Sequence, residues 1–431
     1  MTLGIYIQVP FCQTKCTYCN FHTGVVSRDR YAPYAAALCR EIRELANPPA
    51  SLCVSAVKTA VEFSSNAVQP ADTVYFGGGT PSLLDPAALA EILATLCRSF
   101  PFASALPPAQ KQTSCHPERG RPLDDEGPAV GFCPVEITLE ADPETITSEK
   151  SSAWLSAGFN RISLGAQSFS DLELQSAGRL HRRADIYSAT KILRAAGFDN
   201  ISMDLIAGLP RQTRESWENS ITELLALRPE HISVYMLEID EGSRLGKESL
   251  AGGGRYSAEK IPPDDAIADF YESACARLAA AGYDHYEISN WALPGRRSRH
   301  NLKYWRREPY LSFGAGAHSF DGSTRWANVH DPARYVAMIE QGISPREQIE
   351  PVTSAQALEE EFFLGLRQLD GIDLSRIEST YAASERARVA DLHSRIAGLR
   401  SQGFIELKGS RLRLAPNRLT ISNDVLAELL A

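Results

Sequence analysis

The amino-acid sequence predicts an α/β protein: a partial (β/α)6 barrel of the TIM type, then an α+β middle region, then a small C-terminal helical domain that resembles a winged helix. Two observations carry this prediction. In the first half of the chain, short apolar runs of β type alternate with turn residues and with apolar residues at helical spacing. Near the C-terminus, one helical pattern is followed instead by two short strands. We expect the barrel over 1–240, the middle region over 241–345 and the C-terminal domain over 346–431.

Six short apolar runs predict the barrel strands, because each is followed by Gly, Pro or Asn turn signals. They lie at 5–9, 73–76, 135–140, 161–164, 201–206 and 231–236. A TIM barrel closes with eight strands, so six strands predict an open barrel. Residues 47–71 and 101–133 lack hydrophobic periodicity, and the second stretch is rich in Pro, Gly and charge. We expect both to be surface insertions.

Apolar stripes at 3.6-residue spacing predict the helices that cover this core. The stripes comprise Tyr31, Tyr34, Ala35, Leu38, Ile42 and Leu45 in the first helix, Ile267, Phe270, Tyr271, Ala274 and Leu278 in the middle region, and Val389, Leu392, Ile396 and Leu399 near the C-terminus. The last helix ends at Gly403, and strands at 404–407 and 412–414 flank a Lys408-Gly409 turn. Winged helices often bind DNA, but few basic residues accompany this one, so a docking or lid role is favoured.

The composition narrows the class of protein. Lys and Arg number 44 against 53 Asp and Glu, and a net charge of −9 disfavours nucleic acid as a partner. No apolar run reaches the roughly 18 residues of a membrane-spanning helix, and the start lacks the pattern of a signal peptide. Nine cysteines are an odd number without the dense spacing of a secreted disulfide framework. We therefore expect a cytoplasmic protein with free thiols or metal ligands.

The pattern Cys12-x-x-x-Cys16-x-x-Cys19 lies directly after the first predicted strand, where barrels carry functional loops. Chance produces this pattern somewhere in the chain with a probability of about 0.4%. A redox pair and a zinc site are the alternatives, but the nearest fourth zinc ligand, His22, is unconvincing. Three thiolates on a [4Fe-4S] cluster leave one iron open, and that iron can chelate the amino and carboxylate groups of S-adenosylmethionine (SAM).

Six motifs make the chain resemble the oxygen-independent coproporphyrinogen III oxidase-like family of radical SAM proteins. The motifs are GIYIQVPFCQTKCTYCNF at 4–21, FGGGTPSLL at 76–84, TLEADPE at 138–144, NRISLGAQSF at 160–169, GRLHRR at 178–183 and MDLIAGLP at 203–210. They follow the order of the family and span nearly the whole chain apart from the two insertions.

The resemblance implies a [4Fe-4S] cluster on Cys12, Cys16 and Cys19, and it implies residues that bind SAM. These are Tyr6, Tyr18, Gly79, Thr80, Pro81 and Glu140, with Gln167, Arg179 and Asp204 at positions that contact a second SAM molecule in the oxidase. Glycines after the second strand let the backbone approach a ligand closely. Structural alternatives remain, because the polar residues could form ion pairs or caps at the barrel rim and the tyrosines could be buried core residues.

One departure separates the chain from the oxidase. The oxidase has a further cysteine two positions after the third cluster cysteine, where this chain has Phe21, preceded by Asn20. This form, together with HNLKYW at 300–305 and GAGAHSF at 314–320, resembles a subgroup of haem chaperones. Gln8 replaces the usual His of the family, without an evident consequence. Cys115 and Cys133 of the second insertion form no ligand pattern and are interpreted as incidental thiols.

The subgroup implies haem as cargo and acceptor apo-haemoproteins as partners. Haem iron needs an axial donor, and His300 is the first candidate, with a hydrogen-bonded core histidine as the alternative and His318 as a weaker candidate. The leading hypothesis is a haem chaperone that carries the cluster and SAM. The alternatives are a radical SAM enzyme such as the oxidase and, disfavoured by the acidic charge, a nucleic-acid regulator. A homodimer and peripheral membrane contact remain open.

Overall fold

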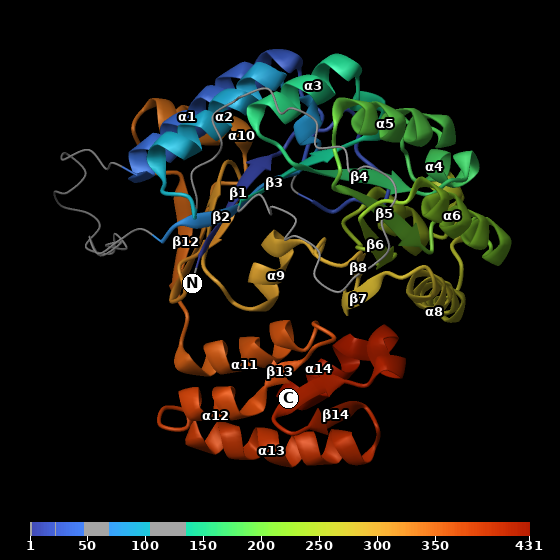
Figure 1. Cartoon of the computed structure of the whole chain (residues 1–431), viewed down its shortest axis with the longest axis vertical. Helices are drawn as coiled ribbons and strands as arrows, with labels where there is room; N and C mark the ends of the chain where they lie inside the picture. Colours follow the sequence, from blue (N-terminus) through green and yellow to red (C-terminus); the bar gives the residue numbers. More distant parts are fainter. Residues whose placement is uncertain (1, 22, 47–68, 104–134) are drawn as a thin grey trace, which may run out of the picture.

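The computed structural model describes residues 2–21, 23–46, 69–103 and 135–431, and a twisted, open sheet forms its centre (Figure 1). Within these residues the sheet has 12 strands in the order β12-β11-β10-β9-β1-β2-β3-β4-β5-β6-β8-β7. Consecutive parallel neighbours from β1 to β6 form the barrel wall. The predicted α/β class and the open barrel are confirmed.

All six predicted barrel strands are present. Their bounds are β1 (Leu3–Val9), β2 (Ala71–Gly78), β3 (Glu136–Ala141), β4 (Arg161–Gln167), β5 (Ile201–Ala207) and β6 (His231–Met236). A seventh strand, β9 (Tyr310–Phe313), pairs in parallel with β1 and was not predicted. At four residues, it is too short for alternation to distinguish it from a loop.

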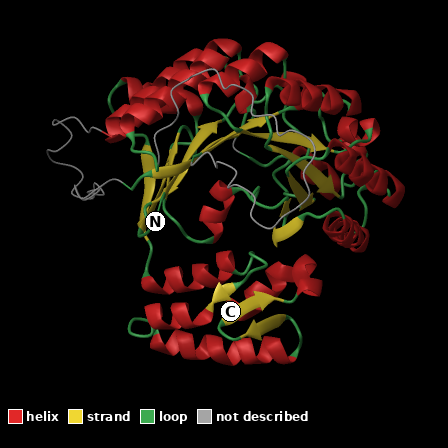
Figure 2. Cartoon of the chain, viewed as in Figure 1, coloured by secondary structure: helices red, strands yellow, loops and turns green. Residues whose placement is uncertain are grey.

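Helices cover the outer face of the sheet, as Figure 2 shows. They are α1 (Tyr31–Ala46), α2 (Pro86–Ser99), α3 (Ser148–Ala157), α4 (Asp171–Ser176), α5 (Arg183–Ala196), α6 (Arg214–Leu227) and α8 (Asp264–Ala280), together with α10 (Pro332–Glu340), which follows β11. The predicted stripes of α1 and α8 are largely buried against the sheet. Strand residues with odd and even numbers therefore face different environments, helices outside and a polar lumen inside.

The middle region extends both edges of the barrel sheet. Its elements are α7 (Arg244–Leu250), β7 (Asp284–Glu287), β8 (Asn290–Ala292), α9 (Arg299–Trp305), β10 (His318–Phe320), β11 (Thr324–Asn328) and β12 (Arg346–Pro351). Helix α9 lies on the concave side of the sheet (Figure 1). Strand β12 pairs with β11 although it follows residue 345. The division of the chain into domains at that point stays a prediction.

The C-terminal segment forms a small helical unit with its own sheet, in the order β13-β15-β14. Its elements are α11 (Ser354–Gly365), β13 (Ile372–Asp373), α12 (Leu374–Tyr381), α13 (Arg386–Ser401), β14 (Ile405–Lys408), β15 (Arg411–Leu414) and α14 (Ser422–Leu430). Helix α13 ends before Gly403, and Gly409 turns the hairpin with a φ of 61°. These are the predicted helix and strands of a winged-helix-like unit.

Two predictions concern segments that lie mostly outside the described residues: the insertions at 47–71 and 101–133. Cys115, Cys133 and His22 also lie outside them. At the described edges, Ala71 already begins β2 and forms a bridge with Phe102. Across the described part of the chain, no helix is long and apolar enough to span a membrane.

Candidate functional site

The loop after β1 carries the three predicted cluster ligands. Backbone hydrogen bonds close it at its base, because Cys12 N–H donates to the Gly24 carbonyl (3.0 Å) and Gly24 N–H donates to the Pro10 carbonyl (2.9 Å). Cys12, Cys16 and Cys19 are all partly exposed between these ends. The loop therefore begins at the end of a barrel strand and is closed at its base by hydrogen bonds. Its partly exposed thiols are accessible to a ligand.

Two neighbouring segments hold the far side of this loop through Thr17. Thr17 N–H donates to the Ala177 carbonyl (2.9 Å), and Leu245 N–H donates to the Thr17 carbonyl (2.8 Å). Ala177 follows α4 and Leu245 lies in α7, so a barrel loop and the middle region both fix the loop. A buried residue between the second and third cysteines limits how far their thiols can move.

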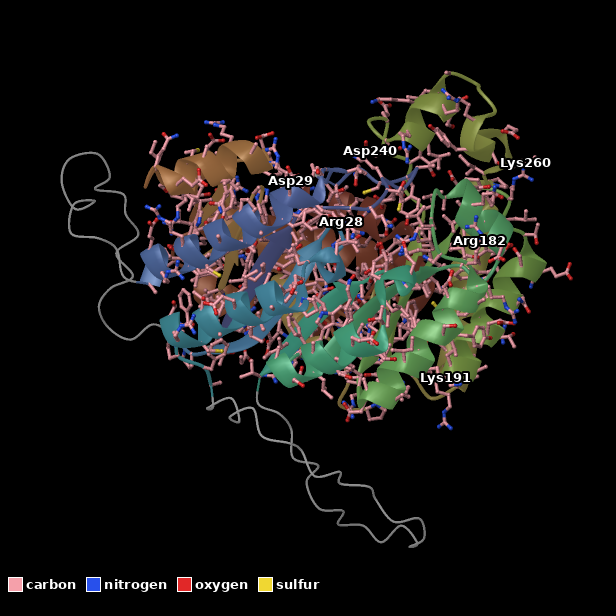
Figure 3. The ribbon with its side chains drawn as sticks, turned by 90° about the horizontal axis from the view of Figure 1, so that it is seen from above. Arg28, Asp29, Arg182, Lys191, Asp240 and Lys260 are labelled. Atoms are coloured by element: carbon pink, nitrogen blue, oxygen red, sulfur yellow. The ribbon has the colours of Figure 1, made fainter. Side chains whose placement is uncertain are left out.

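The segment that follows β6 also packs against the loop. Asn20 donates a 3.2 Å side-chain hydrogen bond to Asp240. In Figure 3, Asp240 lies at the same edge of the molecule as Arg28 and Asp29, the residues just beyond the loop. The segments that follow β1 and β6, the first and last strands of the barrel wall, thus meet at the open end of the barrel.

The three thiols are the predicted ligands of a [4Fe-4S] cluster. In the residues described, no three His, Cys, Asp or Glu side chains converge closely enough to hold one metal ion. Ligands of a four-iron cluster bind different irons and therefore stand farther apart. Burial raises the pKa of the Cys12 and Cys19 thiols, so ligation by iron would release their protons.

The glycine turn after β2 packs directly on the cluster loop. A Cβ on Gly79 would stand 2.4 Å from the Phe11 carbonyl oxygen and 3.0 Å from the Cys12 Sγ atom. Thr80 N–H donates to the same Phe11 carbonyl at 2.7 Å. Only glycine permits this close approach, which places the turn and the first predicted cluster ligand side by side. Pro81 follows at the first position of a short 3-10 helix, Pro81–Leu83.

Glu140 ends β3 inside the barrel and faces the glycine turn. Its carboxylate accepts hydrogen bonds from the Tyr75 hydroxyl (2.8 Å) and from Gly78 N–H (3.1 Å). Burial raises the pKa of Glu140 to about 7, and the nearby Asp204 adds to the shift. A cationic ligand beside it would favour the carboxylate, which fits the ammonium group of SAM.

Asp204 and its neighbours make the lumen polar. Burial raises the pKa of Asp204 to about 6, while Ser233 and Arg161 oppose the shift. The Oδ1 atom of Asp204, the Oγ1 atom of Thr138 and the Nε atom of Arg161 are buried without a hydrogen-bond partner in the described structure. Buried polar atoms normally have partners, so these three atoms fit a position beside a polar ligand.

Arg179 connects the cluster loop to β3 and β4. Its guanidinium lies 3.5 Å from the Cys16 Sγ atom and donates to the Gly165 carbonyl (3.0 Å) and to Asp142. Asp142 also accepts a 3.0 Å hydrogen bond from Thr80. The sequence-based site included Arg179 and Thr80 but not Asp142, because an Asp before a proline resembles an ordinary turn residue.

The remaining predicted SAM residues also face this end of the barrel or its interior. Gln167 ends β4 with a φ of 65°, a left-handed conformation that non-glycine residues adopt at strained and functional positions. Tyr18 is partly buried beside Cys16 and Arg179, and burial raises its pKa. The Tyr6 hydroxyl donates to Gln8 (2.9 Å), which gives the unusual Gln8 a structural role. The structure thus brings the SAM candidates together around the lumen and leaves their roles as predictions.

His300 lies in α9 near the start of β2, and its ring stacks on two tyrosines of the barrel interior, with centroid distances of 5.2 Å to Tyr75 and 6.2 Å to Tyr6. It is 1% exposed, and its Nδ1 and Nε2 atoms pair with the hydroxyls of Thr73 (2.8 Å) and Tyr304 (2.9 Å). Burial lowers the pKa of His300 to about 3. This is the geometry of the core alternative, because both ring nitrogens already have partners. His318 is exposed at the start of β10, with its ring centroid 6.3 Å from that of His330.

Comparisons with known proteins identify the family and the fold of the chain. Residues 6–224 match the family described as the radical SAM superfamily, and residues 352–417 match the family described as the HemN C-terminal domain. The solved structure of coproporphyrinogen III oxidase (HemN) from Escherichia coli superimposes with a TM-score of 0.75 and 21% identity, over 99% of this chain and 90% of that chain. The fold and the matched family define a radical SAM protein.

Curated relatives show which group of radical SAM proteins the chain resembles in sequence over nearly its full length. "Heme chaperone HemW" of Bacillus subtilis (strain 168) is 31% identical over 99% of this chain and 98% of its own length. "Heme chaperone HemW" of Synechocystis sp. is 32% identical over 97% of this chain and 90% of its own length. The chain belongs to the HemW family of radical SAM proteins.

Proposed function

We propose that this protein is a haem chaperone, which binds haem and transfers it to acceptor apo-haemoproteins. Membership of the HemW family supports this function, since relatives named as haem chaperones match nearly the full chain. The observation that carries it in the structure is Phe21, which is 66% exposed two residues after Cys19. An exposed phenyl ring offers an apolar contact to a macrocycle, and it stands where the resembling oxidase has a cysteine.

The cofactors that fit the site are a [4Fe-4S] cluster on Cys12, Cys16 and Cys19 and SAM in the adjacent lumen. When bound and reduced, the cluster supplies an electron to SAM. The chain's own residues orient the ligand. Glu140 and the backbone around Gly79 would receive the ammonium group, while the closed loop base at Cys12 and Gly24 fixes the thiols.

The interior of the barrel contains polar side chains, and it therefore suits a polar ligand better than it suits apolar packing. Asp204 offers a buried oxygen that has no hydrogen-bond partner among the described residues, and Gln167 and Arg179 stand at the same end of the barrel. These three residues are proposed to contact SAM, as their positions in the resembling oxidase suggest. TIM barrels are normally filled by branched apolar side chains, so buried polar groups here favour ligand binding.

Anaerobic reconstitution with iron and sulfide, followed by parallel titrations, tests the function. One titration adds haem, and the other adds coproporphyrinogen III with SAM and a reductant. We expect stoichiometric haem binding and transfer of haem to an apo-haemoprotein, without release of carbon dioxide. Turnover of the porphyrinogen to carbon dioxide and 5′-deoxyadenosine would instead identify an oxidase that works without the further cysteine.

A matched pair of variants refines this experiment. Phe21→Ala removes the exposed ring, and we expect weaker haem binding with unchanged iron content. Leu250→Ala removes an equally exposed side chain from α7 and serves as the control, with haem binding as in the wild type. Equal haem affinity in both variants would show that Phe21 does not contact haem, and it would not contradict haem binding by the protein.

A further inference from the structure

Arg179 is unusual in the site because it contacts one of the predicted cluster ligands directly. Its side chain is 9% exposed. The Nη1 atom lies 3.5 Å from the Cys16 Sγ atom, and the Nη2 atom donates to the Gly165 carbonyl at 3.0 Å. The guanidinium is therefore fixed between β4 and the cluster loop, with one N–H group directed at sulfur.

Asp142 fixes the position of this guanidinium. It forms an ion pair with Arg179 and accepts a 3.0 Å hydrogen bond from Thr80. A cation and an anion thus stand at fixed positions beside the thiols.

Charges at such positions act on an iron–sulfur cluster in opposite directions. Reduction adds one negative charge to the cluster, and a nearby cation or a hydrogen bond to a ligand sulfur stabilises the reduced form. A nearby anion destabilises the reduced form. In a partly buried site, solvent screens both effects less than it would at the surface.

We propose that the partly buried Arg179–Asp142 ion pair sets the reduction potential of the cluster, with Arg179 raising the potential through its contact with Cys16 and Asp142 limiting that rise. Arg179 is a positioning and electrostatic residue in this role, separate from any contact with SAM. The ion pair tunes how readily the cluster accepts an electron whether or not haem is carried.

Dye-mediated redox titrations of the reconstituted protein, followed by electron paramagnetic resonance, test the proposal. They are carried out without SAM, so that a lost SAM contact cannot change the result. We expect Arg179→Gln to lower the midpoint potential and Asp142→Asn to raise it. The amide in the Asp142→Asn variant keeps a similar shape, and its oxygen can still accept from Arg179 or Thr80. Arg183→Gln is the control, because Arg183 is half exposed and pairs with Glu223.

The signs of the two shifts decide the outcome. Opposite shifts in Arg179→Gln and Asp142→Asn, with the Arg183→Gln potential unchanged, support the proposal. Potentials equal to that of the wild type in both variants, at full iron content, would overturn it, as would shifts of the same sign. If Arg179→Gln fails to keep its cluster, Arg179→Lys retains the charge without the guanidinium fork. A lowered midpoint potential in Arg179→Lys then supports the contact with sulfur. A midpoint potential equal to that of the wild type in both Arg179→Lys and Asp142→Asn overturns the proposal.

Discussion

The Tyr34 hydroxyl donates a 2.8 Å hydrogen bond to the main-chain carbonyl of Gln8 and also accepts one from Ala315 N–H at 2.9 Å. A single side chain of α1 thereby joins β1 to the turn that follows β9. Gln8 lies four residues before Cys12. The outer helix therefore contributes to the position of the strand end from which the cluster loop begins.

A buried carboxylate on the same helix completes this junction. Glu41 accepts hydrogen bonds from Tyr335 (2.6 Å), Gly314 N–H (2.9 Å) and Asn328 (2.6 Å). Burial raises its pKa to about 7, above its ordinary value of 4.5, while these hydrogen bonds and Arg346 oppose the shift. Protonated Glu41 is therefore favoured in the folded chain.

The first prediction is that Glu41 makes the protein less stable as the pH rises. A group with a raised pKa contributes stability that is fully present below about 4.5 and is lost as the pH passes about 7. The difference corresponds to at most about 3 kcal/mol. Thermal unfolding of the wild type and of Glu41→Gln between about pH 5 and pH 8 should show a flatter pH dependence in the variant. Parallel curves would mean that Glu41 does not titrate in this range.

A second prediction concerns the contact between the glycine turn and the cluster loop. Gly79→Ala should force the two segments apart, because its Cβ would stand 2.4 Å from the Phe11 carbonyl oxygen, a backbone atom. We expect a loss of roughly 1–3 kcal/mol in stability and weaker SAM binding. Gly24→Ala is the matched control in the same loop, since nothing lies within 4 Å of its added Cβ. Equilibrium dialysis with labelled SAM measures the binding, and equal affinities in both variants would contradict close packing at Gly79.

Much of the barrel could be predicted from the sequence because its strands and helices are long enough to show a period. The first helix also carried an unused signal. Glu41 falls on the stripe of Tyr34 and Leu38, and a charged residue on an apolar stripe indicates a buried polar contact. Its partners lie more than 250 residues away in sequence, so they follow only from the tertiary structure.

The site could be predicted only in part, for a similar reason. The cysteine spacing and the motifs indicated the cluster ligands and the lumen residues. Asp142 was missed because its partner Arg179 lies 37 residues further along the chain, across the mouth of the barrel. His300 was chosen as a haem ligand from its residue type, whereas its burial depends on α9 packing against the start of β2. Neither the pairing of Asp142 with Arg179 nor the burial of His300 produces a local pattern in the sequence.

A third prediction separates the two interpretations of His300. His300→Ala removes the partner of two buried hydroxyls, on Thr73 and Tyr304, and leaves a cavity. We expect a loss of about 2–4 kcal/mol in stability, with haem binding retained by the folded protein. His393→Ala, at a half-exposed ion pair with Glu378, should cost less than about 1 kcal/mol. Reduced haem binding at unchanged stability would instead assign His300 to the haem.

The fourth prediction tests the cluster ligands themselves. Cys16→Ala should abolish the cluster, because two remaining thiolates leave a second iron without a protein ligand. The barrel should stay folded, since Cys16 is partly exposed and the hydrogen bonds of the loop run through its neighbour Thr17. Cys97→Ala, in α2 on the outer layer, is the matched control and should keep the full cluster. Iron and sulfide analysis, visible absorbance and circular dichroism measure these properties, and a Cys16→Ala protein with a complete cluster would refute the assignment of Cys16 as a ligand.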